Sequence, residues 1–228
     1  SDRVRITTYD TGAGAAAAAQ RAIADGNKLI LGPLLADDVR AVQPIARAAN
    51  VPLISFSNDS SVAGNGTYLL GFEPGQAVNR VVAHARAQGV TRFGALAPRS
   101  TYGERAMAAM RTAVTTAGGT LVAAESYDRS ATGLSGAARR LGTAGQMGAV
   151  LIADSGSTAI RAVPLLRAAG GTGSRILGTE LWNTESTLSA NANMRNAWFA
   201  SVSDGLFGQM AARYRERYGR TPYRIASM

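Results

Sequence analysis

The chain has no cysteine in its 228 residues, which excludes disulfide bonds, thiolate nucleophiles and cysteine metal ligands together. It also has a single histidine, His84, and the pattern around it predicts a mid-helix position away from strand ends. A lone histidine there is typical of a surface or half-buried side chain rather than a catalytic base. No G-x-S-x-G motif occurs. Because no nucleophile and base come together, we expect the chain not to be an enzyme.

Long apolar runs are also missing, since none approaches the roughly 18 residues that cross a membrane. Hydrophobic residues still make up 46% of the chain, which is enough for a real core. The formal net charge is +9, and every basic residue except Lys28 is an arginine. These arginines are spread along the chain and rarely lie beside aromatic residues. We therefore interpret the charge as solvated surface and predict no nucleic-acid partner.

What the chain does contain is a repeating strand–helix pattern, clearest in residues 28–57. There an apolar run stops at Gly32-Pro33, a helical pattern fills Asp37–Ala49, and a second apolar run begins at Leu53. Such short, unalternating runs are typical of strands buried on both faces of a parallel sheet. Because the alternation continues to the end of the chain, the sequence predicts an α/β fold with parallel sheets.

The expected elements follow from this pattern. Predicted strands and extended segments are Val4–Tyr9, Leu29–Leu31, Leu53–Phe56, Tyr68–Leu70, Arg92–Ala97, Leu121–Ser126, Ala149–Ala153, Arg175–Leu177 and Trp198–Ser201. Predicted helices are Ala13–Ala24, Asp37–Ala49, Gln76–Gln88, Gly103–Ala117, Leu134–Ala144, Thr158–Ala169 and Asp204–Tyr218.

The pattern also predicts two lobes joined by a hinge, with crossings near Leu70–Pro74 and at Trp198–Ser201. The first lobe is expected to comprise residues 1–71 plus 200–228, and the second lobe residues 72–199. In the common strand order 2-1-3-4-5 the first strand lies in the middle of the sheet. Val4–Tyr9 would then be a second strand without its central neighbour, so we expect the first lobe to be incomplete in this sequence. Any targeting segment would lie upstream of Ser1.

Two motifs suggest other chemistry. Gly12-Ala13-Gly14 followed by Ala17 fits G-x-G-x-x-A, and between a strand and a helix this pattern is the context of a dinucleotide-binding loop. The next predicted strand lacks the acidic residue that would hold a ribose, which favours an Ala-rich helix start over a nucleotide-dependent enzyme. Asp37-Asp38 would suggest a metal site, but adjacent helical residues do not face each other and carboxylates suit a helix N-terminus. We expect no cofactor and no metal.

Polar loops follow five of the predicted strands, and all are expected on the same edge of their sheets. Hydroxyls, amides, backbone N–H groups and a few charges gathered in this way suit a small polar ligand. For any one loop, ordinary solvent exposure is the simpler explanation, but five together favour binding. The loops are Leu34–Asp38, Ser57–Ser61, Arg99–Tyr102, Asp154–Ser157 and Thr179–Trp182.

Several short segments in and around these loops form a recognisable series along the chain. They are I-L-G-P-L (Ile30–Leu34), V-P-L-I-S-F-S (Val51–Ser57), L-G-F-E-P (Leu70–Pro74), Y-G-E (Tyr102–Glu104), A-G-G-T-L-V (Ala117–Val122), I-L-G-T-E (Ile176–Glu180) and R-Y-G-R-T-P (Arg217–Pro222). In order and spacing they resemble the type I periplasmic binding proteins of the Leu/Ile/Val-receptor group. The phrases at Ile54–Gly64 and Trp198–Val202 also look like a subgroup identified as penicillin-binding-protein activators, which are outer-membrane lipoproteins that stimulate peptidoglycan synthases.

The resemblance implies two Rossmann-like lobes that close on a ligand by a hinge motion and perform no chemistry. The implied function is a periplasmic receptor of the ABC-transporter type for a small polar, amino-acid-like ligand, with an ABC permease as its partner. The subgroup implies an alternative function: a regulator anchored to the outer membrane by a lipid upstream of the sequence, with a peptidoglycan synthase as its partner.

The resemblance also implies which residues contact the ligand. In amino-acid receptors of the group, the position of Glu180 takes the ligand ammonium. The first lobe departs from the pattern, because positions that usually offer hydroxyls to a ligand carboxylate hold Ala36 and Asp59. An aspartate would repel a carboxylate unless it were protonated or bridged by a cation, so a cationic or polyhydroxyl ligand, or an empty cleft, fits better. The implied contacts are Ala36, Asp37, Ser57, Asn58 and Asp59 in the first lobe and Tyr102, Asp154, Ser155, Glu180 and Trp182 in the second.

Overall fold

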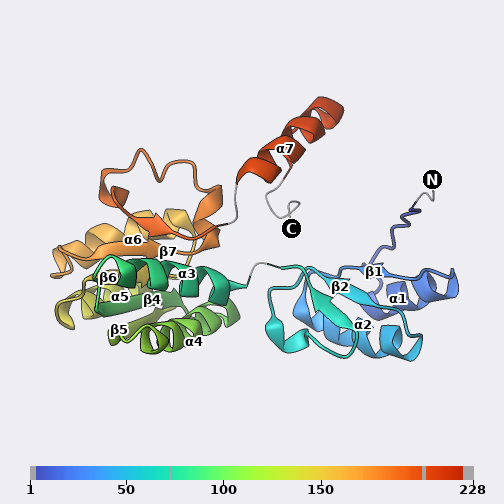
Figure 1. Ribbon diagram of the computed structural model, residues 1–228, viewed down its shortest axis with the longest axis horizontal. Coiled ribbons are helices and arrows are strands. Elements are labelled where there is room, and N and C mark those ends of the chain that lie inside the picture. The colour runs from blue at the N-terminus through green and yellow to red at the C-terminus, as the bar shows by residue number, and fades with distance from the viewer. Residues whose placement is uncertain (1–3, 72, 202–203, 223–228) are drawn as a thin grey trace. The chain divides into compact units, whose positions relative to one another are not determined.

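The computed structural model describes residues 4–71, 73–201 and 204–222. Its internal contacts divide the described chain into two compact units (Figure 1): unit 1 runs to Glu73, and unit 2 begins at Pro74. The expected placement of residues 200–228 in the first lobe stays a prediction. Within the described ranges, no helix is both long and apolar enough to span a membrane.

The elements alternate as the sequence predicts, with boundaries within a few residues of the expected ones. Unit 1 contains α1 (Ala15–Ala24), β1 (Ile30–Leu31), α2 (Ala36–Ala48), β2 (Leu53–Ser55), a 3₁₀ turn η1 (Ser60–Val62) and β3 (Thr67–Leu69). Unit 2 contains α3 (Pro74–Ala87), β4 (Arg92–Pro98), α4 (Thr101–Thr116), β5 (Thr120–Tyr127), α5 (Ala131–Thr143), β6 (Ala149–Ile152), α6 (Gly156–Ala168), β7 (Arg175–Gly178), the 3₁₀ turns η2 (Glu180–Thr184) and η3 (Ala192–Met194), β8 (Trp198–Phe199) and α7 (Asp204–Tyr218).

Unit 1 is built on a parallel sheet in the order β1-β2-β3. Leu53 lies opposite Ile30 on one side and Thr67 on the other, so β2 occupies the centre. The small residues of α1 let it pack closely on α2, and the core joins Ala15 and Ala19 to Val39 and Val42. The parallel arrangement places the ends of β1 and β2, with their polar loops, on one edge.

The predicted strand at Val4–Tyr9 is wrong. Residues 4–10 have no regular secondary structure, and Val4 and Ile6 are 89% and 76% exposed. A strand exists only through hydrogen bonds to a neighbouring strand, and no described strand pairs with this segment. The G-x-G-x-x-A pattern that follows therefore lacks the strand–turn–helix context that a dinucleotide-binding loop requires.

Unit 2 contains the larger parallel sheet, in the order β5-β4-β6-β7-β8. Numbered within the unit, this is the doubly wound order 2-1-3-4-5. The chain leaves β4 toward β5 on one side, and β6 then pairs with β4 on the other side. The order reverses between β4 and β6, and the crevice outside their carboxyl ends is where sheets of this kind bind ligands.

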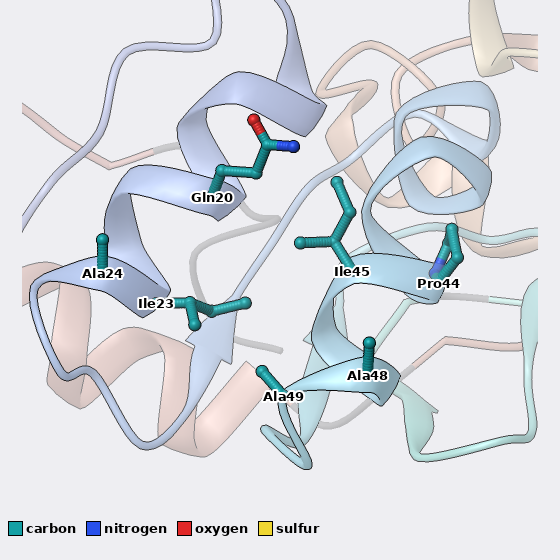
Figure 2. Close-up of a pocket in the computed structure, with 7 residues that line it drawn as sticks. All are labelled: Gln20, Ile23, Ala24, Pro44, Ile45, Ala48 and Ala49. Carbon is teal, nitrogen blue, oxygen red and sulfur yellow. The ribbon is translucent and has the colours of Figure 1, made fainter.

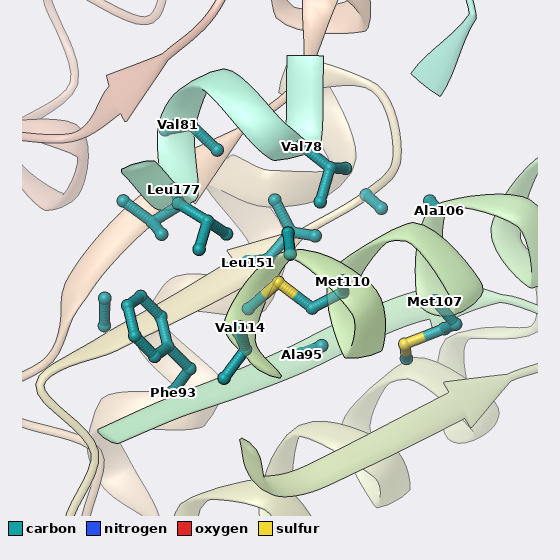
Figure 3. Packing of buried hydrophobic residues seen from close by; sticks show 14 of the residues in the cluster. Val78, Val81, Phe93, Ala95, Ala106, Met107, Met110, Val114, Leu151 and Leu177 are labelled. Atoms are coloured by element: carbon teal, nitrogen blue, oxygen red, sulfur yellow. The ribbon is translucent and has the colours of Figure 1, made fainter. Parts of the chain in front are cut away.

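The helices of unit 2 cover both faces of its sheet. On one face, α3 and α4 pack their apolar residues onto Phe93, Ala95 and Leu151, as Figure 3 shows. On the other face, α5 and α6 pack onto Leu96 and the neighbouring strand residues. Because both faces are buried, β4 from its second residue onward and all of β6 lie in the core. This explains their unalternating apolar sequences.

Serine residues begin three helices of unit 2. The hydroxyls of Ser100, Ser130 and Ser155 accept hydrogen bonds from backbone N–H groups in the first turns of α4, α5 and α6. Serine is a preferred cap because its oxygen satisfies a donor that the helix leaves free. The caps fix where each helix starts after its strand, and so fix the loops at the strand-end edge.

Candidate functional site

The carboxyl edge of the sheet in unit 2 gathers polar side chains from four strand ends. We call this set the strand-end edge. It comprises Tyr102 after β4, Tyr127 and Arg129 at and after β5, Asp154 and Ser155 after β6, and Thr179 and Glu180 after β7.

Tyr102 connects the ends of β4 and β7. Its hydroxyl lies 2.8 Å from Thr179 Oγ1 and donates a hydrogen bond of 2.9 Å to Glu180 Oε1. Burial and the nearby charge of Glu180 both raise the pKa of Tyr102, so the phenol stays protonated and available as a donor. The tyrosine position is made possible by Gly103, where a Cβ would lie 1.9 Å from the carbonyl oxygen of Pro98.

Glu180 is the most unusual group at this edge. Its Oε2 atom is buried, and no donor in the described part of the chain bonds to it. Burial raises the pKa of Glu180, although the hydrogen bond from Tyr102 acts in the opposite direction. An unmatched buried carboxylate oxygen costs about 1–3 kcal/mol or more, so this site favours a molecule that supplies a donor.

Asp154 lies almost completely buried at the end of β6, and its carboxylate is already well bonded. It accepts hydrogen bonds of 2.5 Å from the Tyr127 hydroxyl and 2.7 Å from the Ser155 N–H. The guanidinium of Arg129 lies 3.4 Å away and compensates its charge. Burial and the bond to Asp154 raise the pKa of Tyr127. These contacts give Asp154 a positioning role at the edge.

The other two predicted contacts of unit 2 have different surroundings. Trp182 is 1% exposed and belongs to the core on the α5 and α6 face, where its indole N–H donates to the carbonyl oxygen of Asp154. Ser155 is half-buried, and its hydroxyl caps α6. Trp182 therefore holds the backbone of Asp154 from the core side of the strand-end edge. Its role in ligand contact stays a prediction.

In unit 1, a chain of serine bonds shapes the loop after β2. The Ser55 hydroxyl donates to the carbonyl oxygen of Pro33 and accepts from the Ser57 N–H, and the Ser57 hydroxyl accepts from the Asp59 N–H. Asp59 then caps η1 by accepting from the N–H and the hydroxyl of Ser61. These bonds bring the ends of β1 and β2 together.

Arg40 changes what the sequence suggests about Asp59. The Asp59 side chain is 6% exposed, and the Arg40 guanidinium lies 3.1 Å from it and 2.8 Å from Asp37. The Asp59 charge is therefore buried and paired, so it is not an isolated negative charge facing a ligand. Sequence reasoning missed this pair because Arg40 and Asp59 are 19 positions apart.

The remaining predicted contacts of unit 1 lie near the surface. Asp37 has a 97% exposed side chain, Asn58 is exposed, and Ala36 is half-buried at the start of α2. The structure thus brings the start of α2 and the loop after β2 together through Arg40. Whether these residues contact a ligand stays a prediction.

Several side chains at the edges were not among the predicted contacts: Tyr127, Arg129, Thr179 and Arg40. Tyr127 and Arg129 follow a strand of the same sheet, so the strand-end rule that selected the other loops would have found them. Arg40 lies three residues after Asp37 on α2, a spacing at which opposite charges pair. Only the bond to Asp59 required the structure.

An apolar groove lies elsewhere in unit 1, between α1 and α2 (Figure 2). It has a volume of about 620 Å³, and Gln20 is the one polar side chain in its lining. Ala48 and Ala49 lie at the end of α2, and this helix runs back from the strand-end edge where it begins. The groove is therefore distinct from the polar loops, and its lining is a poor match for a polar ligand.

The chain matches one protein family, and its fold is similar to that of several solved structures. A profile described as periplasmic binding protein matches residues 3–228. No curated protein sequence matches the chain. The fold is similar to that of a solute-binding protein of an ABC transporter from Rhodopseudomonas palustris BisB5 in complex with 3,4-dihydroxybenzoic acid. That match has a TM-score of 0.68 at 18% identity and covers 93% of this chain and 61% of the other.

Two further structures show the same fold. A branched-chain amino-acid ABC transporter periplasmic ligand-binding protein from Burkholderia xenovorans LB400 matches with a TM-score of 0.67 at 16% identity, over 96% of this chain and 62% of that one. A leucine-binding protein from Thermotoga maritima MSB8 matches with a TM-score of 0.57 at 18% identity, over 91% and 62%. The chain thus spans less than two thirds of each of these structures. Because the family profile covers nearly every residue, the chain belongs to the periplasmic binding protein family and has its type I fold.

Proposed function

We propose that the chain is the ligand-binding part of a periplasmic receptor of the ABC-transporter type, and that it takes a small, polar, amino-acid-like molecule. The strand-end edge of unit 2 provides the main contacts, with Glu180 accepting from the ligand ammonium. An ABC permease is the expected partner. Family membership and the fold support the receptor class.

One observation carries the ligand chemistry: the buried Oε2 atom of Glu180 has no donor in the described chain. Tyr102 and Thr179 beside it are neutral, and no described arginine forms an ion pair with Glu180. A ligand ammonium supplies both the missing donor and the missing positive charge. A phenol, as in 3,4-dihydroxybenzoic acid, would supply only the donor.

The loops of unit 1 are proposed to provide the second set of contacts, through Ala36, Asp37 and Ser57–Asp59. The pairing of Arg40 with Asp59 supports this proposal, because it weakens the repulsion that an isolated aspartate would exert on a ligand carboxylate; Arg40 also pairs with Asp37. An ordinary α-amino acid, which carries both an ammonium and a carboxylate, is therefore included among the ligands to be tested.

The test is binding of an amino-acid panel and of 3,4-dihydroxybenzoate to the chain, measured by thermal shift and isothermal titration. At least one amino acid is expected to bind. Glu180→Gln should weaken that binding about 30-fold or more, because a charge pair in a buried site contributes several kcal/mol. Glu104→Gln is the matched control, since Glu104 is an exposed residue in the first turn of α4.

Two results would contradict the proposal. Equal loss of affinity in Glu180→Gln and Glu104→Gln would show that Glu180 does not contact the ligand. Failure of every compound to bind would remove the receptor function and leave the alternative, a lipoprotein regulator of a peptidoglycan synthase, to be tested by co-purification with such an enzyme.

A further inference from the structure

Two arginines lie near the bonded pair of Tyr127 and Asp154 at the strand-end edge, and the proposed ammonium contact does not involve either of them. Arg129 follows β5, and its guanidinium lies 3.4 Å from Asp154 with 66% of the side chain exposed. Arg161 is exposed and lies in the second turn of α6. Both lie close enough to the Tyr127 hydroxyl for their charges to lower its pKa, against the larger effect of burial.

The two arginines differ in their ion pairing. Asp154 is the one buried carboxylate here, and Arg129 compensates it. Arg161 makes a long hydrogen bond of 3.4 Å to the neutral Thr158 hydroxyl, and no carboxylate in residues 4–71, 73–201 or 204–222 pairs with it. The first turn of α6 also contains no acidic residue, so the helix adds to the positive potential. The carboxylates of Asp128 and Glu185 also lie nearby, but they accept hydrogen bonds from Ser130 and Thr187. Arg161 is thus the arginine here that no carboxylate of the described residues pairs with.

The position of this charge relative to Glu180 follows from the sheet. Glu180 follows β7, Asp154 follows β6, and these strands are neighbours. Neighbouring strands are about 5 Å apart, so the loops that begin with Asp154 and Glu180 are adjacent along the edge. Asp154 also acts electrostatically on Tyr102, the tyrosine that donates to Glu180. Asp154 and Glu180 thus belong to the same part of the strand-end edge.

We propose that Arg129 and Arg161 form a subsite for a second anionic group of the ligand, so that the receptor selects acidic amino acids over their neutral counterparts. This inference rests on the proposed function, because it needs the ligand ammonium at Glu180. Arg129 is held against Asp154, which orients its guanidinium, while Arg161 provides a guanidinium that no described carboxylate pairs with. A carboxylate or phosphate would accept hydrogen bonds from both.

The experiment compares matched ligand pairs by isothermal titration: aspartate with asparagine, glutamate with glutamine, and O-phosphoserine with serine. In the unmodified chain, at least one acidic member should bind about 10-fold or more tighter than its neutral partner, the usual effect of a charge-assisted hydrogen bond. Arg161→Gln should remove that preference and leave affinity for the neutral partner unchanged. Arg161→Lys should restore part of it.

Arg139→Gln is the matched control. Arg139 is exposed on the second half of α5, which lies toward the opposite edge of the sheet, and its loss changes the net charge by the same amount. If Arg139→Gln and Arg161→Gln lower acid binding equally, the effect is general charge and the subsite is refuted. If neutral amino acids bind and acidic ones bind no tighter, the subsite is refuted while the receptor function stands. If no pair binds while another amino acid of the panel does, the subsite is refuted and the receptor function stands. If nothing in the panel binds, both fail.

Discussion

The proposed role of Glu180 in ligand binding has a cost for the stability of the ligand-free fold. Burial raises the pKa of this carboxyl above its ordinary value of 4.5, which means that the folded chain holds the charged form at a cost. Glu180→Gln keeps the size of the side chain and removes the charge. The same change that weakens ligand binding is therefore expected to stabilise the empty protein at neutral pH.

The pH dependence has a definite sign. A carboxyl whose pKa is higher in the folded state contributes stability that is complete below its unfolded pKa and is lost as the pH rises through the folded pKa. The unmodified chain should lose this contribution from about pH 4.5 upward, through the raised pKa of Glu180. The glutamine variant should not, so the difference between the two proteins should grow with pH.

The size of the effect follows from the contacts. An unmatched buried polar atom costs about 1–3 kcal/mol, and more when it is charged. The glutamine amide would still leave one of its two polar atoms without a partner. The variant therefore regains only the part of the free-energy cost that comes from the charge, about 1 kcal/mol. For a unit of this size, that corresponds to a rise of about 2–4 °C in the melting temperature.

Thermal unfolding followed by circular dichroism, without ligand and at about pH 4.5, 6 and 7.5, measures this difference. Glu104→Gln, at an exposed position in the first turn of α4, should not raise the melting temperature at any of these pH values, because it removes only a favourable charge at a helix N-terminus. A Glu180→Gln variant that melts below the unmodified chain at pH 7.5 would refute the reasoning. So would a difference that stays constant across the three pH values.

Two further changes test the supports of the strand-end edge. Tyr127→Phe removes a donor from buried Asp154 and should lower the free energy of unfolding by about 1–3 kcal/mol in urea titrations, so an unchanged midpoint would contradict the bond. Gly178→Ala would place a Cβ 2.2 Å from the Trp182 ring and should cost about 1–3 kcal/mol with an altered near-ultraviolet signal, whereas Gly173→Ala, in open space, should have little effect.

Much of the fold could be predicted from the sequence, because its signals are local. Short apolar runs and the helical patterns between them place β4, β6 and the intervening helices within a few residues. Val4–Tyr9 failed because a strand also requires a partner, and apolar alternation within one segment does not show whether a partner lies beside it. The strand order of unit 2 follows from the structure, which brings residues of four loops to one edge.

The candidate site was predictable in its positions but not in its electrostatics. Tyr102, Asp154 and Glu180 could be placed at strand ends from the pattern alone. Which charges are paired depends on side chains that meet across the sheet: Asp154 is compensated by Arg129, and Asp59 by Arg40. Those pairings decide what remains for a ligand, and neighbouring sequence does not specify them.

The order of the strands in unit 2 has a consequence for how ligand preference can change during evolution. The strand-end edge draws one or two side chains from each of four successive strand–helix repeats, while the core lies beneath, between the sheet and its helices. Each repeat can therefore vary its last few residues without disturbing the packing that keeps the others in place. Selectivity in such a protein can drift one loop at a time, so close relatives are expected to differ first at residues such as Arg129 and Arg161.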